Sequence, residues 1–213
     1  MEKNISTIIF DFGNVLIDLD IPGFYKRMKQ LTGLSKNEDV STMVEISKSY
    51  EQGKLSTELF INQIIKSSRH SIQAREIIKT WNSMLIGIRP EVLALLKDLK
   101  PHYRIYILSN TNPLHIQWVN EHLHHQHNVE NFETEYLHGV FYSHRIRLIK
   151  PHPEIYTYVQ NEIGISSDEI LYLDDMEVNV VGARNAGWTA IIHPPGQSLE
   201  KSLDPYIPIS KII

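Results

Sequence analysis

Short apolar runs that stop abruptly at polar residues mark several strands along the chain. The run IIF at 8–10 is unbroken and ends at Asp11, a pattern typical of a strand buried on both faces. Further runs of this kind occupy 103–108, 170–173 and 188–192. These runs predict buried strands that end in polar side chains.

Segments with helical spacing of apolar residues lie between these runs. In 90–100 the apolar residues fall on one helical face, and prolines stand at the start and just after the end. Further helices are expected after Pro113, from Pro153 to Gly164, and over 177–186. Because helices and strands alternate from residue 90 onward, we expect an α/β, doubly wound, mainly parallel sheet with helices on both faces.

Residues 18–87 have a different pattern, because they hold helices only. The expected helices cover 24–31, 40–50, 56–66 and 72–84. We therefore expect a core domain formed by 1–17 and 88–213, and a separate helical lobe formed by 18–87. Residues 120–148 give no clear pattern, and four of the ten prolines follow residue 193, so the tail is expected to be a loop.

Composition narrows the class of protein and its compartment. The 213 residues are 42% hydrophobic and include no cysteine, which excludes disulfides, thiolate metal sites and cysteine nucleophiles. The net charge of −4 gives no general attraction to nucleic acid or acidic membranes, although a local basic patch stays open. No apolar run approaches the roughly 20 residues of a membrane span, and the start lacks a signal-peptide pattern. We expect a cytoplasmic protein without a nucleic-acid or membrane partner.

Side chains that can do chemistry follow three of the predicted strands. Asp11, Ser109 and the pair Asp174-Asp175 stand at carboxyl ends, where open parallel sheets bind ligands. Neighbouring carboxylates repel each other unless a cation lies between them, so this set suggests an oxygen-liganded metal, and magnesium first. Lys150 adds a positive charge suited to phosphate.

The chain resembles the haloacid-dehalogenase-like hydrolases. Four motifs in the family's order carry the resemblance: FDFGNV (10–15), LSNTN (108–112), KPHPEIY (150–156) and YLDDMEVN (172–179). The matching core, Rossmann-like in this family, covers about 5–20 and 88–193. The helical lobe looks like the four-helix cap of the subfamily that holds β-phosphoglucomutase and phosphoglycolate phosphatase. The sequences of these motifs are most similar to those of a bacterial subgroup that includes an α-D-glucose-1-phosphate phosphatase.

The resemblance implies a magnesium-dependent phosphomonoester hydrolase that forms an aspartyl-phosphate. Its substrate is expected to be a small phosphorylated metabolite, with a hexose 1-phosphate as the leading class, and the protein a monomer or weak homodimer. The implied roles are Asp11 as nucleophile, Ser109 and the amide of Asn110 as phosphate ligands, Lys150 as the neutralising charge, and Asp11, Asp174, Asp175 and the main-chain carbonyl of Gly13 as metal ligands.

Gly13 departs from the family pattern. Phosphatases of the family usually carry a second Asp there as general acid and base, and the similar subgroup shares the Gly. A backbone with positive φ would be another reason for glycine. Asp18 and Asp20 are either a solvated linker or substitute acids. A non-catalytic phospholigand-binding or regulatory protein and a metal-independent dehalogenase-type hydrolase remain the alternatives, whereas a phosphomutase would need the missing Asp.

Several other residues have two interpretations. Asn179 orients a ligand or faces the helix surface, and Thr111 and Asn112 shape a phosphate loop or only turn the chain. The residues around the Gly53 turn either face the site and select substrate or are simply exposed: Tyr50, Glu51 and Lys54. A histidine cluster is either a zinc site or, as we expect, a solvated surface segment: His122, His124, His125 and His127.

Overall fold

A five-stranded parallel sheet forms the core of the computed structural model, which describes residues 4–34 and 37–212. Its strand order is β5–β4–β1–β6–β7, and every neighbouring pair is parallel. The strands are β1 (Thr7–Phe10), β4 (Arg104–Ser109), β5 (Gly139–Tyr142), β6 (Ile170–Asp174) and β7 (Thr189–Ile192). The first strand of the chain is therefore central, and the doubly wound α/β prediction is confirmed.

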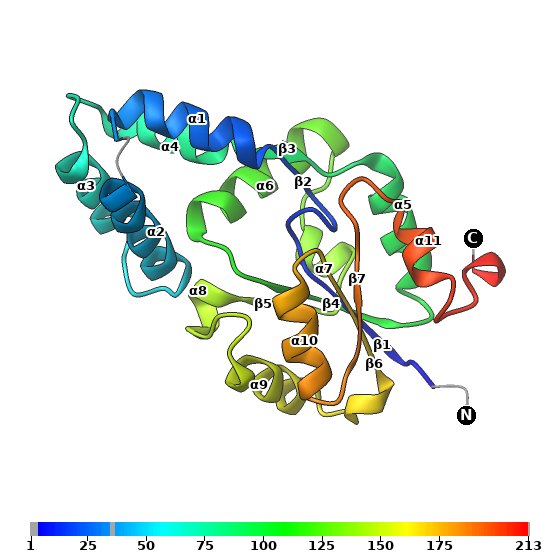
Figure 1. Ribbon diagram of the computed structural model, residues 1–213. Helices are drawn as coiled ribbons and strands as arrows, with labels where there is room; N and C mark the ends of the chain where they lie inside the picture. Colours follow the sequence, from blue (N-terminus) through cyan, green and yellow to red (C-terminus); the bar gives the residue numbers. More distant parts are fainter. Residues whose placement is uncertain (1–3, 35–36, 213) are drawn as a thin grey trace.

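Helices cover both faces of this sheet (Figure 1). On one face Ile8 and Phe10 join a cluster with α5 (Pro90–Leu99) and α6 (Pro113–His127). On the other face Ile9 joins a cluster with α9 (Pro153–Ile163) and α10 (Glu177–Asn185). Because β1 has apolar packing on both sides, its residues 8–10 are an unbroken apolar run that does not alternate.

Four helices form a lobe at the end of the molecule away from both termini (Figure 1). They are α1 (Ile21–Thr32), α2 (Asn37–Glu51), α3 (Thr57–Ser67) and α4 (Ala74–Asn82). Their own hydrophobic cluster centres on aromatic rings: Phe60 stacks on Tyr50 at 4.2 Å and meets Trp81 edge-on at 4.6 Å between centroids. This separate cluster supports the expected division at 18–87, which stays a prediction.

Some elements differ from the sequence-based expectation. Residues 18–87 are not helix-only, because β2 (Asp18–Leu19) pairs antiparallel with β3 (Leu85–Gly87) where the chain enters and leaves the lobe. Strands this short are too brief to show an alternating pattern. Residues 120–148, which gave no clear pattern, contain α7 (Phe132–Glu135), β5 and α8 (Ser143–Ile146), together with the end of α6. Two 3₁₀ helices occupy Ser167–Glu169 and Ile209–Lys211.

The tail is not simply a loop, because it contains the helix α11 (Leu199–Leu203). Ser198 caps this helix by accepting a hydrogen bond from the N–H of Lys201. Leu199 and Leu203 are buried in the core cluster that also holds α5. The short helix is thus held by tertiary packing. The proline content of the tail, which predicted a loop, gives no sign of this packing.

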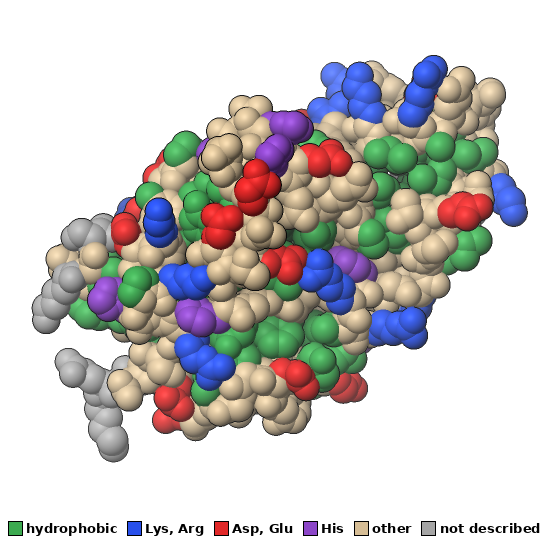
Figure 2. All heavy atoms as spheres, turned by 180° about the vertical axis from the view of Figure 1, so that it is seen from behind, with side chains coloured by type: hydrophobic (Ala, Val, Ile, Leu, Met, Phe, Trp, Pro, Cys, Tyr) green, Lys and Arg blue, Asp and Glu red, His purple; other side chains and the backbone are tan. Residues whose placement is uncertain are grey.

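The surface carries charges of both signs. On the face seen in Figure 2, Lys and Arg side chains are interspersed with Asp and Glu side chains. Within the described part of the chain, none of the helices combines the length and apolar character needed to cross a bilayer.

Candidate functional site

The ends of three adjacent strands bring the predicted site residues together. Asp11 directly follows β1, Ser109 ends β4 and Asp174 ends β6, and β1 lies between the other two strands. The N–H of Asp11 donates to the carbonyl of Leu173 at 2.7 Å, which fixes the end of β1 against β6. Carboxylate oxygens of Asp11, Asp174 and Asp175 lie within 4.8 Å of one another.

Lys150 occupies the centre of this group with a buried ammonium. Its Nζ lies 2.8 Å from Asp11 Oδ1, 2.6 Å from Asp174 Oδ2 and 3.0 Å from the hydroxyl of Tyr172. Asn110 holds the backbone of Lys150 from both sides, since its Nδ2 donates to the Lys150 carbonyl (3.1 Å) and its Oδ1 accepts from the Lys150 N–H (2.9 Å). The side chain of Asn110 is thereby occupied, which leaves its main-chain amide for a ligand.

The cluster holds more negative than positive charge. Burial raises the pKa of Asp11 to about 7 despite the opposing effect of Lys150, and Asp174 adds to the rise. Burial alone would lower the pKa of Lys150, but Asp11 and Asp174 outweigh it and raise that pKa. Burial also raises the pKa of Asp175, and Asp174 contributes. Three carboxylates around one ammonium therefore form a site whose charge a divalent cation would balance.

The two adjacent aspartates differ in how many hydrogen bonds they accept. Asp174 is fully buried and accepts from Lys150, Tyr172, Asn179 and the N–H of Met176. Asp175 is partly exposed, and one of its oxygens accepts from the Nδ2 of Asn14 at 2.9 Å. Hard carboxylate oxygens of this kind fit magnesium. Asp175 and Asp11 have more free acceptor capacity for it than Asp174 has.

Three residues that support the site escaped sequence reasoning. Tyr172 bonds both Lys150 and Asp174, although its place in an apolar strand suggested only packing. Asn14 adopts a left-handed backbone (φ 54°) and reaches Asp175. Asn after Gly is a signal for such a turn. Ser143 Oγ accepts from the N–H of Thr111 at 3.0 Å, in a stretch whose pattern was unreadable.

The structure decides some of the open alternatives. Asn179 is buried and its Nδ2 donates to both oxygens of Asp174, so it orients a site residue and does not face the surface. Asn112 caps α6 by accepting from the N–H of His115 (3.1 Å). Gly13 has no positive φ, so the suggested left-handed backbone at that position is wrong. The residue with positive φ is Asn14.

Asp18 and Asp20 lie at the base of the lobe and are paired with arginines. Asp18 lies 3.3 Å from Arg89, and Asp20 lies 2.9 Å from Arg27. Asp20 also caps α1 by accepting from the N–H of Gly23. The hydrogen bond from Arg27 lowers the pKa of Asp20, which makes this carboxyl a poor proton donor near neutral pH. Both residues thus hold the junction together.

The histidines of α6 have local partners. His124 lies 3.1 Å from Glu130, and His122 stacks on Trp118 with centroids 4.8 Å apart. In the described residues, the group of three or more side chains able to hold a metal is Asp11, Asp174 and Asp175, and no histidine joins it. A zinc site at His122, His124, His125 and His127 has no structural support here.

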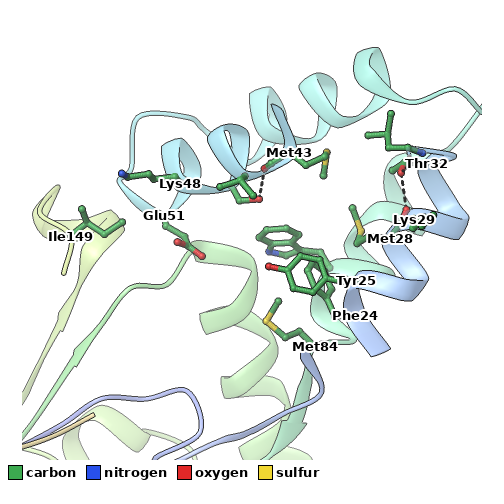
Figure 3. A pocket seen from close by; sticks show the side chains of 14 residues that line it. Phe24, Tyr25, Met28, Lys29, Thr32, Met43, Lys48, Glu51, Met84 and Ile149 are labelled. Carbon is green, nitrogen blue, oxygen red and sulfur yellow. Dashed lines mark hydrogen bonds between the residues drawn. The ribbon is translucent and has the colours of Figure 1, made fainter. Parts of the chain in front are cut away.

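A mainly apolar pocket of about 480 Å³ lies within the lobe, between α1, α2 and α4, and meets the core at Ile149 (Figure 3). Its lining includes Phe24, Met28, Met43, Trp81, Met84 and Ile149. None of the predicted catalytic, phosphate-binding or metal-binding residues lines the pocket; its links to the site are Ile149, which precedes Lys150 in the chain, and the hydrogen bond from Trp81 Nε1 to Asn112 Oδ1 (3.2 Å). Near the Gly53 turn, Glu51 lines the pocket, whereas Tyr50 is buried against Thr57 and Lys54 is exposed. Only Glu51 of these three contacts the pocket.

Two curated relatives are phosphatases. The chain is 25% identical over 194 residues to the D-ribitol-5-phosphate phosphatase of Bacteroides thetaiotaomicron, covering 86% of this chain and 89% of the relative. It is 24% identical over 158 residues to a sesquiterpene phosphatase of Aspergillus oryzae, covering 72% of this chain and 76% of the relative.

The fold and the sequence identify the family. The crystal structure of a haloacid-dehalogenase-family enzyme of Bacteroides thetaiotaomicron, in complex with magnesium and inorganic phosphate, aligns with TM-score 0.82 and 27% identity, covering 93% of this chain and 98% of that one. A sequence model of the haloacid dehalogenase-like hydrolases matches residues 5–187, which is most of the chain. The protein belongs to the haloacid dehalogenase-like hydrolase family.

Proposed function

We propose that the protein is a magnesium-dependent phosphomonoester hydrolase that acts on a small phosphorylated metabolite through an aspartyl-phosphate. The observation that carries this proposal is the cluster of Asp11, Asp174 and Asp175 around the buried ammonium of Lys150. A curated relative that hydrolyses D-ribitol 5-phosphate and a related structure that holds magnesium and phosphate support it.

Each side chain has a role that its contacts allow. Asp11 Oδ attacks phosphorus, and the substrate oxygen leaves on the opposite side. The ammonium of Lys150 neutralises charge on Asp11 and on the phosphoryl oxygens, while Asn110 fixes the backbone of Lys150 and offers its main-chain amide. Ser109 adds a hydroxyl from the end of β4. The expected ligands of magnesium are Asp11, Asp174, Asp175 and the main-chain carbonyl of Gly13. When bound, the ion would stabilise negative charge on the phosphoryl group.

The charge balance of the site favours this function over its rivals. A metal-independent dehalogenase needs an ionised Asp nucleophile, but burial and Asp174 raise the pKa of Asp11 to about 7. A cation in the site would restore the ionised form. A non-catalytic phospholigand-binding protein would need neither the nucleophile nor its close contact with Lys150 (2.8 Å).

The chemical class of the substrate has two candidates. The first is a sugar or alditol phosphate, including the hexose 1-phosphate expected from the sequence, and the ribitol-phosphate phosphatase supports it. The second is a phosphate with an apolar organic group, which the pocket favours. Two hydroxyl groups of its lining already donate hydrogen bonds to main-chain carbonyls. The Thr32 hydroxyl donates to Met28 (2.8 Å) and the Ser47 hydroxyl to Met43 (2.7 Å; Figure 3). The sesquiterpene phosphatase is a relative of that second kind.

Phosphate release from a substrate panel tests the function and separates these classes. The panel contains a hexose 1-phosphate, ribitol 5-phosphate, a prenyl monophosphate and p-nitrophenyl phosphate, each with magnesium and after chelation by EDTA. We expect activity with magnesium that EDTA removes and added magnesium restores. Activity that survives exhaustive chelation would support the dehalogenase-type alternative, and no release from any substrate would support the non-catalytic one.

Introducing the missing carboxylate at Gly13 tests whether its absence limits the rate of turnover. A Cβ there would lie 2.9 Å from Leu19 Cδ1, the end of a half-buried flexible side chain that can turn away, so Gly13→Asp alone is expected to cost little stability. Combined with Leu19→Ala, the new Asp should raise kcat for alkyl phosphates by up to about 10²-fold, the lower end of what a positioned acid contributes. The matched control is Gly13→Asn with Leu19→Ala. An equal gain in that control would show that space, and not the carboxyl group, limits turnover.

A further inference from the structure

Turnover of a phosphomonoester needs a proton donor for the leaving oxygen and a proton acceptor for the attacking water. Gly13 has no side chain to offer, and Asp18 and Asp20 are paired with Arg89 and Arg27. If the protein hydrolyses phosphomonoesters as proposed above, another group has to carry the proton. Glu51 is the candidate that the structure offers.

Hydrogen bonds tie Glu51 to the loop that follows β4. The hydroxyl of Ser143 donates to the carbonyl of Glu51 at 2.6 Å and accepts from the N–H of Thr111 at 3.0 Å. Thr111 is two residues after Ser109, the predicted phosphate ligand. The end of α2 is therefore linked through one side chain to the phosphate loop.

The turn after Glu51 lies directly against the core. Gly53 has φ +65°, and a Cβ there would overlap the carbonyl oxygen of His144 in α8. The positive φ and the close approach both require glycine. This contact keeps the last residues of α2 next to the site.

The carboxylate of Glu51 points into the pocket, on the side where Ile149 of the core lies (Figure 3). Ile149 immediately precedes Lys150, so this side of the pocket is the one that faces the core and the site. In-line attack by Asp11 sends the leaving oxygen away from the sheet edge, toward the lobe. A proton carrier is needed on that side.

Glu51 has no ionic or hydrogen-bonding partner for its carboxylate among the described residues. Its pKa is raised from 4.5 to about 7 by burial. The other charged and titratable groups that line the pocket are Lys48 on the same helix and Lys29 and Tyr25 from α1, and none of them shifts the pKa of Glu51. From α8, the main chain of His144 packs against the Gly53 turn. A group with a pKa near the working pH can both give and take a proton efficiently.

We propose that Glu51 is the general acid and base of the reaction. In the first step Asp11 forms a bond to phosphorus, the bond from phosphorus to the substrate oxygen breaks, and the carboxyl proton of Glu51 passes to that oxygen. In the second step the carboxylate of Glu51 takes a proton from water as the water oxygen attacks phosphorus. The bond between Asp11 and phosphorus breaks, which releases inorganic phosphate and restores both carboxyl groups to their starting states.

Glu51→Gln tests this role, with Glu45→Gln on the exposed side of the same helix as the control. We expect Glu51→Gln to lower kcat for the best alkyl phosphate of the panel by roughly 10²–10⁴-fold. The fall of kcat/KM above about pH 7, where wild-type Glu51 loses its proton, should disappear in the variant. Glu45→Gln should behave as wild type.

The activated substrate p-nitrophenyl phosphate separates the two steps. Nitrophenolate leaves without a proton, so the phosphorylation step of Glu51→Gln should keep a rate within a few-fold of wild type. Breakdown of the aspartyl-phosphate still needs the base, and a burst close to one equivalent of nitrophenolate per active site should therefore appear in the variant only.

Two outcomes would overturn the assignment of Glu51. One is an equal loss on alkyl and aryl phosphates with an unchanged pH profile, which a merely structural role would give, and thermal melts would then show a loss of stability. The other is unchanged alkyl phosphatase activity. In both cases the wild-type protein still releases phosphate in the presence of magnesium, so only the assignment of Glu51 fails. If the proposed function itself is wrong, the wild-type protein shows no magnesium-dependent phosphate release.

Discussion

Replacing Asp11 by Asn should lower kcat for every phosphomonoester by roughly 10³-fold or more, as loss of a covalent nucleophile does. The amide has nearly the same shape as the carboxylate but is not nucleophilic, so no aspartyl-phosphate can form. Asp98→Asn, an exposed change on α5, is the matched control. Steady-state phosphate release and single-turnover trapping of the phosphoenzyme measure the effect.

Stability distinguishes a lost nucleophile from a damaged fold. The folded pKa of Asp11 is raised to about 7 from 3.8. The native state then binds more protons than the unfolded state between these values, and metal-free stability falls as pH rises through this window. Asp11→Asn removes that fall, so the variant should melt no lower than wild type at pH 8. A variant that keeps more than a few per cent of wild-type turnover would contradict the covalent mechanism.

The sequence predicted the site because its residues follow strands that are easy to recognise. β1 and β6 are buried on both faces, so their apolar runs are continuous and end at Asp11 and Asp174. Parallel pairing through β1 then places these ends at one edge of the sheet. The convergence of Asp11, Asp174 and Asp175 could thus be inferred without coordinates. The strand order was not predicted, and Lys150, which lies in a loop, was assigned from the family resemblance.

Other features depend on contacts that local sequence does not reveal. The pairing of β2 with β3 joins residues more than sixty positions apart, and each strand is only two or three residues long. The role of Glu51 depends on Ser143, which lies in a stretch without a readable pattern. The hydrogen bond from Asn14 to Asp175 spans 161 positions. Long-range contacts of this kind are decided by packing, and neither propensity nor periodicity encodes them.

Lys150→Met should be the most destabilising single change at the site. The ammonium is buried and lies within 3 Å of oxygens of both Asp11 and Asp174. Its removal leaves two buried carboxylates without a counter-charge, which typically costs about 3–5 kcal/mol. Lys97→Met, an exposed change on α5, should stay within about 0.5 kcal/mol of wild type. Denaturant unfolding of metal-free protein at pH 8 measures both, and phosphatase activity of Lys150→Met should be lost as well.

The pH dependence of the stability lost in Lys150→Met identifies the cause of that loss. Lys150 has a raised pKa, so its contribution in wild type is fully present below the usual lysine value and stays constant across pH 5–8. In Lys150→Met the Asp11 carboxyl loses the cation that lowers its pKa in wild type, so it takes up a proton in the folded state as the pH falls. The destabilisation should therefore shrink toward pH 5. A loss that is the same at pH 5 and pH 8 would mean that Lys150 acts through packing alone.

A double variant completes the test of Lys150. If repulsion between Asp11 and Asp174 causes the loss, adding Asp11→Asn to Lys150→Met should recover part of the free energy of unfolding at pH 8, with a coupling of about 0.5–3 kcal/mol. Magnesium should also raise the melting temperature of Lys150→Met, because a cation between Asp11 and Asp175 replaces some of the missing charge. The double variant should show a smaller response, since the amide introduced by Asp11→Asn offers no charge to the metal while Asp174 and Asp175 remain.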